Sequence, residues 1–134
     1  NSNGGTSWDN SDPSGTEWEA ANDPSPAGWR VPTLAELQTL LDTDKVTNEW
    51  TTLNGVTGRK FTDKATGASI FLPAAGDRNY NNGTLYGAGT YGDYWSSPQV
   101  GSYYAYHLDF GGSNANTDYS GRGNGFCVRC VKAE

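Results

Sequence analysis

The sequence predicts a single α+β domain over residues 1–134, with one main helix at about residues 34–41 and several short antiparallel strands joined by long loops. Two observations favour this class. A helix N-terminal signature precedes a stripe of leucines, and short runs rich in β-branched and aromatic residues are separated by Gly, Asn, Asp and Pro. Because one helix accompanies several strands without regular β-α alternation, the expected class is α+β and not a parallel α/β sheet.

The helix is the most clearly signalled element. Thr33 occupies a helix N-cap position and Glu36 follows three residues later, which is the pattern of a capping box. The leucines after the cap lie on one helical stripe: Leu34, Leu37, Leu40 and Leu41. Residues 1–28 are rich in Gly, Ser, Asn, Asp and Pro, so we expect irregular coil there, with Trp8 and Trp18 packed inward.

The remaining elements are expected to be mostly strands. A second short helix or turn is predicted at Val46 to Leu53, with Trp50 inward. Residues 59–62 and 69–72 flank the loop 63–68 and predict a hairpin whose loop is too long for a two-residue turn. Three further strands are expected at Tyr94 to Ser97, Tyr103 to Phe110 and Phe126 to Lys132.

Composition restricts the function classes. A chain of 134 residues is long enough to close one core, and its 5 Trp, 8 Tyr and 4 Phe argue against disorder although it has 18 Gly. The net charge of -6 offers no basic face for a phosphate backbone, so we expect no nucleic-acid partner. No run approaches the roughly 20 apolar residues of a membrane span. The chain begins without Met or a signal sequence, so we expect a mature or excised domain whose signal or tether is not in this chain.

Residues 80–124 are drawn mainly from Asn, Tyr, Gly, Ser, Thr, Asp and Ala, a composition typical of antibody binding surfaces. Within them the strand 103–110 alternates. We expect Tyr104, Tyr106, Leu108 and Phe110 to face the core, and Tyr103, Ala105, His107 and Asp109 to point outward. The strand alone is equally consistent with an ordinary solvated face; the polar and aromatic loops beside it favour a recognition surface.

Catalytic and metal chemistry are not expected. His107 and Asp109 are same-face neighbours roughly 6.6 Å apart, and no GxSxG nucleophile elbow accompanies them. One His and two Cys leave a zinc site short of ligands, and the acidic residues form no EF-hand loop. Cys127 and Cys130 would lie about 10 Å apart on a strand, beyond the roughly 7 Å limit for a disulfide, so we expect small buried hydrophobes. A redox or copper-binding thiol pair is the open alternative.

Five ordered segments, residues 22–33, 54–61, 70–76, 94–97 and 125–131, resemble the FISUMP paralogous domains. They are also similar to the C-type lectin-fold variable proteins that retroelements diversify in gut bacteria and phages. The resemblance runs from about Trp18 to the end of the chain. It implies a C-type lectin-like fold without the lectin calcium site, in which the first and last strands lie close together and the helix packs under Trp29. It also implies a location on a cell surface or virion, of the phage-tail or pilus-tip type, and a binding role.

Two features depart from the family pattern or limit what it implies. Family members often carry Cys where this chain has Ser25, and often Ser where it has Cys127, so the disulfide that the resemblance implies lacks its usual partners. Formylglycine-generating enzymes share the implied fold, but their reactive cysteines are more widely spaced than the CxxC here. An oxidase of that type is therefore only a remote alternative, because fold does not transfer activity.

The resemblance also implies candidate ligand-binding positions. Retroelement mutagenesis acts on adenines, and an Asn codon changed at its first two bases yields the residue types that dominate this region. Family matching gives the changeable positions, all within about residues 77–124: Asp77, Asn79, Tyr80, Tyr86, Tyr91, Asp93, Tyr103, His107, Asp109, Asp118, Tyr119, Ser120 and Gly123. Arg122, Gly125 and Phe126 fall in fixed positions. We expect a non-enzymatic domain that displays these residues to a protein or surface glycan; the alternative is a structural or adhesive FISUMP module without diversified residues.

Overall fold

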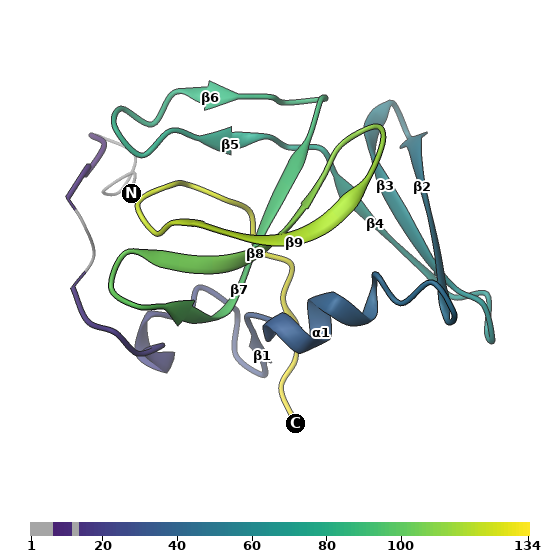
Figure 1. The fold of residues 1–134 in the computed structure, drawn as a ribbon, viewed down its shortest axis with the longest axis horizontal. Coiled ribbons are helices and arrows are strands. Elements are labelled where there is room, and N and C mark those ends of the chain that lie inside the picture. The colour runs from purple at the N-terminus through teal and green to yellow at the C-terminus, as the bar shows by residue number, and fades with distance from the viewer. Residues whose placement is uncertain (1–6, 12–13) are drawn as a thin grey trace.

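The computed structural model describes residues 7–11 and 14–134 and is mostly β: strands cover 44% of the chain and helices 7%. The strands of the described part form four small antiparallel sheets (Figure 1). The helical elements of residues 7–11 and 14–134 are α1 (Leu34–Thr39) and the 3₁₀ turn η2 (Ala20–Asn22). The predicted α+β class and C-type lectin-like fold are therefore wrong, because the described residues contain one short helix and one 3₁₀ turn beside many strands.

The first three-stranded sheet contains β2 (Val46–Leu53), β3 (Val56–Asp63) and β4 (Ser69–Pro73) in that order. The second helix expected at Val46 to Leu53 is wrong, since this segment is β2 and pairs with β3 along its whole length. The reason is local: Asn54 and Gly55 have φ values of 49° and 79°, which fit the two-residue turn that joins twisted hairpin strands. The predicted hairpin between residues 59–62 and 69–72 is confirmed as β3 and β4.

The second three-stranded sheet contains β7 (Gly92–Val100), β8 (Tyr104–Phe110) and β9 (Ala115–Gly121), with β8 in the centre. The first two strands correspond to predicted ones, whereas β9 lies in a segment expected to be loop. Two two-stranded sheets complete the structure: β5 (Asp77–Arg78) pairs with β6 (Leu85–Tyr86), and β1 (Trp29–Arg30) pairs with β10 (Val131–Lys132). The β1-β10 pair confirms that the first and last strands are adjacent, although β10 is shorter than predicted.

The capping box at α1 forms as predicted. The Glu36 N–H donates to Thr33 Oγ1 at 3.2 Å, and the Thr33 N–H donates to Glu36 Oε2 at 2.8 Å. Arg30 adds two hydrogen bonds to the Glu36 carboxylate, at 2.6 and 2.8 Å. The helix packs against the β7-β8-β9 sheet. Trp29 is 49% exposed and is not part of the core cluster. The expectation that α1 packs under it stays a prediction.

The core lies where the two three-stranded sheets and α1 meet. Phe110 is at its centre, with the rings of Trp50 and Phe61 each 6.4 Å away and that of Tyr94 5.9 Å away. Leu108, on the same strand, is fully buried. These contacts attach one side of β8 to the rest of the molecule, which leaves its other side to form the site. Among the described residues, no helix is long and apolar enough to cross a membrane.

Candidate functional site

Polar side chains gather on the side of the β7-β8-β9 sheet that faces away from the core. Asp93 on β7 is paired with Asp109 on β8, and His107 on β8 is paired with Asp118 on β9. Directly opposed residues in an antiparallel pair project from the same side, and so do residues two apart along a strand. These four side chains therefore share one side of the sheet. The predicted separation of His107 and Asp109 from the buried Leu108 is confirmed.

The expectation that His107 points outward is wrong, because its residue is only 3% exposed. Its ring lies 5.7 Å from that of Trp95 and 4.8 Å from that of Phe126. Phe126 in turn stacks on Trp95 at 4.2 Å. The segment that contains Phe126 and Cys127 is held against β7 by backbone hydrogen bonds. Cys127 N donates to Asp93 O and Trp95 N donates to Cys127 O, each at 2.9 Å.

The alternation also fails at the start of β8 and at Asp109. Tyr104, expected in the core, is 47% exposed and contacts the ring of Tyr119 at 5.5 Å. Tyr106 is half-buried and also contacts Tyr119. The apolar side of β8 is therefore covered only at its Leu108 end. Asp109, expected to be outward, is half-buried.

A pocket of about 490 Å³ opens on the polar side of this sheet. Seven of the thirteen predicted ligand-binding residues line it: Asp77, Tyr91, Asp93, His107, Asp109, Asp118 and Ser120. They come from β5, β7, β8, β9 and the segment before β7, so residues 43 positions apart in sequence are brought together. We call this cavity the acidic pocket. Its volume is within the roughly 300 to 1,000 Å³ of small-ligand sites.

Negative charge dominates the acidic pocket. Its lining includes four aspartates and neither lysine nor arginine among the described residues. Burial raises the pKa of the Asp109 carboxyl, and the charges of Asp93 and Asp118 raise it too, against the opposing effect of His107. Burial, followed by the hydrogen bond to Asp77, raises the pKa of the Tyr91 phenol, so Tyr91 remains a neutral donor to that carboxylate.

His107 has one paired and one unpaired ring nitrogen. Nε2 lies 2.9 Å from Ser120 Oγ, which is a hydrogen-bond distance. Nδ1 is buried and makes no hydrogen bond, although it lies 3.4 Å from Asp93 Oδ1. This separation is within ion-pair range when the ring is protonated, but no hydrogen bond joins the two atoms.

The other six predicted residues do not line the acidic pocket: Asn79, Tyr80, Tyr86, Tyr103, Tyr119 and Gly123. The four tyrosines among them are each more than half exposed. Two of the six are close to it: Tyr80 N donates to Asn124 Oδ1 of the pocket lining, and Tyr86 is paired with Asp77. Tyr119 is paired with Tyr106 and therefore projects from the opposite side of the sheet. Tyr103 is apart from the pocket, beyond the far end of β8, where its carbonyl accepts from Arg122 N.

Sequence reasoning missed five lining residues: Phe110, Gly111, Asn114, Asn124 and Phe126. Of these, Phe110 was expected only as a core residue. The two asparagines belong to the polar residue types that marked the region, and this composition was the available signal. The ring of Phe126 lines the site and also packs against Trp95 and His107. That this position is fixed in the family stays a prediction.

The cysteines are free and partly buried. Cys127 packs against the core, as expected for a small buried hydrophobe. Burial, followed by the charge of Asp93, raises the pKa of its thiol, which is the opposite of what a reactive thiolate needs. Within residues 7–11 and 14–134, no group of three or more His, Cys, Asp or Glu side chains is placed to hold a metal ion.

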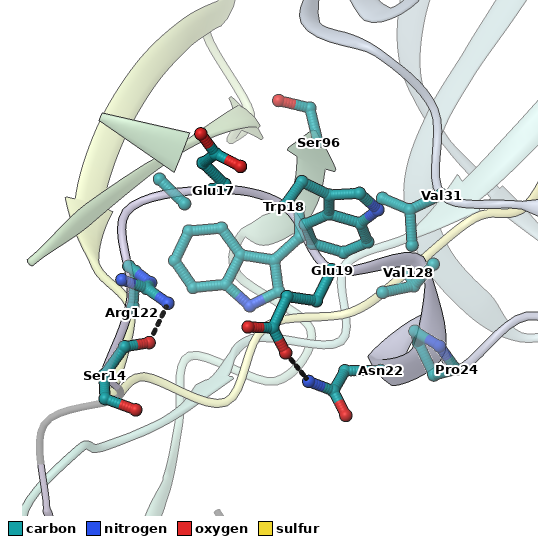
Figure 2. Close-up of a pocket in the computed structure, with 12 residues that line it drawn as sticks. Ser14, Glu17, Trp18, Glu19, Asn22, Pro24, Val31, Ser96, Arg122 and Val128 are labelled. Atoms are coloured by element: carbon teal, nitrogen blue, oxygen red, sulfur yellow. Dashed lines mark hydrogen bonds between the residues drawn. The ribbon is translucent and has the colours of Figure 1, made fainter. Parts of the chain in front are cut away.

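A second pocket, of about 590 Å³, lies beneath the N-terminal segment and contains none of the thirteen predicted residues (Figure 2). Trp18 and Val31 contribute apolar surface. Its polar groups are largely satisfied within the protein: Asn22 donates to Glu19, and the Arg122 guanidinium donates to the Ser14, Gly15 and Ser102 carbonyls. Arg122 thus anchors the N-terminal segment.

Over residues 14–132 the sequence matches the family described as the Fibrobacter succinogenes major domain. The chain belongs to this family. The Fibrobacter succinogenes major domain covers every strand and helix described above, from η2 to β10, and it confirms the FISUMP part of the predicted resemblance. No curated protein and no solved structure matches the chain.

Proposed function

We propose that this protein is a recognition domain that binds a protein or glycan ligand at the acidic pocket and at the exposed tyrosines beside it. One observation carries the proposal. Seven of the thirteen positions that the resemblance implies as ligand-binding line a single pocket beside the β7-β8-β9 sheet.

The chemistry of this surface suits recognition. Tyr80 and Tyr86 are each more than half exposed, and they present rigid rings with hydroxyl tips next to pocket residues. Tyrosine contributes contact area at low cost in side-chain entropy, which is why binding surfaces are enriched in it. The acidic pocket beside them supplies polar groups that fix orientation, as the few polar groups of ligand pockets generally do.

We also propose that the thirteen positions vary between copies of the gene through retroelement mutagenesis at adenines, and that the domain is displayed on a cell surface or virion. The residue types at these positions support the proposal, because all of them except Gly123 and Ser120 are Asp, Asn, Tyr or His, which an Asn codon reaches by a single change at its first base or none. Sequencing the locus in related isolates tests it. We expect substitutions at these codons and constant codons for Leu108 and Phe110; substitutions spread evenly over both sets would refute it.

A binding experiment separates recognition from a structural role. The fluorescently labelled domain would be added to a panel of intact gut bacteria, and binding measured by flow cytometry. The double variant Tyr80→Ala, Tyr86→Ala should lose at least about tenfold in apparent affinity, because exposed aromatics dominate such interfaces. The control is Leu53→Ala, Val56→Ala, two exposed apolar residues on the distant β2-β3 hairpin. Equal loss in both variants would refute a site at the predicted positions.

A further inference from the structure

We propose that the acidic pocket receives a cationic N–H group, the ammonium of a lysine or the guanidinium of an arginine on a protein ligand. This inference rests on the proposed function and specifies its chemistry. It follows from two independent features of the pocket, its uncompensated charge and an unpaired nitrogen of His107.

The first feature is charge. Asp93 and Asp109 are buried or half-buried, and Asp77 and Asp118 line the same cavity. Burying carboxylates is costly unless they are paired, and no lysine or arginine among the described residues lines this cavity. The guanidinium of Arg59 reaches its edge at the Gly111 carbonyl, to which it donates at 2.9 Å. An incoming cation would interact with several carboxylates at once and relieve the repulsion between them.

The second feature is the arrangement of acceptors at His107. When the ring is neutral and its Nε2–H donates to Ser120 Oγ, Nδ1 carries a lone pair. Nδ1 itself lies 3.4 Å from Asp93 Oδ1 and makes no hydrogen bond, so in this tautomer two acceptors are close together with no donor between them. Buried polar atoms are normally satisfied, and an unsatisfied one in a cavity calls for an explanation. A group with several N–H donors would satisfy both atoms, whereas a group that only accepts would satisfy neither.

The surroundings favour a side chain over a metal ion or a neutral sugar. The described residues hold no group of three ligands placed for a metal. Sugar hydroxyls would leave the carboxylate charges uncompensated. The ring of Phe126 forms part of the lining, and long cationic side chains typically place their methylene stem on apolar surface with the charged end in a polar site. A lysine or arginine side chain supplies a positive charge, several N–H donors and an apolar stem.

The test uses small probes on the whole domain, followed by amide chemical shifts in NMR titrations. The cationic probes are the N-acetyl methylamides of lysine and arginine; the neutral probes are those of norleucine and citrulline. We expect both cationic probes to shift the amides of Gly111 and Asp118, with dissociation constants at least about tenfold lower than those of the neutral probes. Raising the salt concentration should weaken the binding of the cationic probes and leave the binding of the neutral probes unchanged.

Matched variants show where the probe binds. Asp93→Asn, Asp118→Asn should weaken the cationic probes by about tenfold or more, since each change removes a charge with little change in shape. Asp44→Asn, Glu49→Gln removes the same net charge at exposed residues outside the pocket and should have less than about twofold effect, because distant exposed charges are screened. If the double variant fails to fold because Asp93 is buried, the single variant Asp118→Asn is titrated instead. It should fold, because Asp118 is exposed.

Four outcomes would overturn the inference. The first two are equal chemical shift changes from the norleucine and lysine probes, and equal effects of the two double variants on probe affinity. The other two are stoichiometric binding of calcium ions that shifts the same amides, and binding of glucosamine oligomers without binding of the amino-acid probes. Each leaves the proposed function in place if cell binding still depends on the tyrosines. Conversely, pocket binding of the lysine or arginine probe without tyrosine-dependent cell binding would support the inference and remove the proposed function.

Discussion

Replacing His107 by alanine should strongly destabilise this protein, although alternation along β8 alone places the residue on the polar side. The imidazole is 3% exposed and packs edge-on against the rings of Trp95 and Phe126. Its removal creates a cavity beneath both rings and deletes the hydrogen-bond contact with Ser120. Large-to-small changes at buried sites cost about 2 to 5 kcal/mol, and a lost hydrogen bond costs about 1 kcal/mol. Because the ring is smaller and more polar than a buried leucine, we expect about 2 to 4 kcal/mol.

Urea denaturation followed by tryptophan fluorescence measures this loss, with linear extrapolation to zero denaturant. Trp95 lies against the substituted ring and should report the transition directly. Tyr103→Ala is the control, since Tyr103 is 59% exposed and should change the free energy of unfolding by no more than about 0.5 kcal/mol. A loss below about 0.5 kcal/mol for His107→Ala would show that the C-terminal segment does not cover this ring, and the geometry of the acidic pocket would be wrong.

Three further perturbations test the core and the charges. Leu108→Ala should cost about 2 to 5 kcal/mol in the same urea titration, because Leu108 is 0% exposed, whereas Tyr104→Ala at 47% exposure should cost less than about 1 kcal/mol. The hydrogen bonds from Arg30 lower the pKa of Glu36 to about 2, so its stabilisation is present above the ordinary value of 4.5 and is lost as pH falls toward 2. Since this carboxylate is 39% exposed, screening limits the effect, and Glu36→Gln should remove about 1 kcal/mol at pH 7 and almost none near pH 2. Burial raises the pKa of the Asp109 carboxyl above its ordinary value of 3.8, so the folded state gains stability as pH falls through the raised pKa toward 3.8. Asp109→Asn should therefore be more stable than the parent at pH 7, and the difference should vanish in acid.

Local signals predicted the elements that depend on a few adjacent residues. The capping box at Thr33 and Glu36 correctly located α1, and the polar loop at residues 63–68 correctly located the β3-β4 hairpin. The segment Val46 to Leu53, expected to be a short helix or turn, is strand β2 instead. The hairpin turn signal, Asn54-Gly55, lies just beyond the segment, and pairing with β3 fixes the extended conformation.

The site depends on contacts that alternation along one strand does not contain. Alternation correctly separated His107 and Asp109 from Leu108, but it does not reveal which segment covers either side of a strand. Phe126 reaches His107 because the backbone near Cys127 pairs with β7, a contact between residues more than 30 positions apart. The burial of His107 is therefore a tertiary effect. The convergence of Asp77 with Asp109 has the same origin, since β5 and β8 belong to different sheets.

The structure divides the proposed variable positions by how freely they can change. Backbone hydrogen bonds to β7 and β9 hold β8 whatever its side chains are, and Leu108 and Phe110 anchor it to the core. Asp118, which is exposed, can therefore be replaced by small or large residues at little cost. Position 107 differs because its side chain fills the space beside Trp95 and Phe126. Under the proposed diversification, folded variants should keep mid-sized side chains such as His, Asn or Tyr at 107 and exclude Gly, while position 118 accepts all of them. Sequencing stably expressed members of a library randomised at both codons decides this, and equal frequencies of Gly at 107 and 118 would contradict the division.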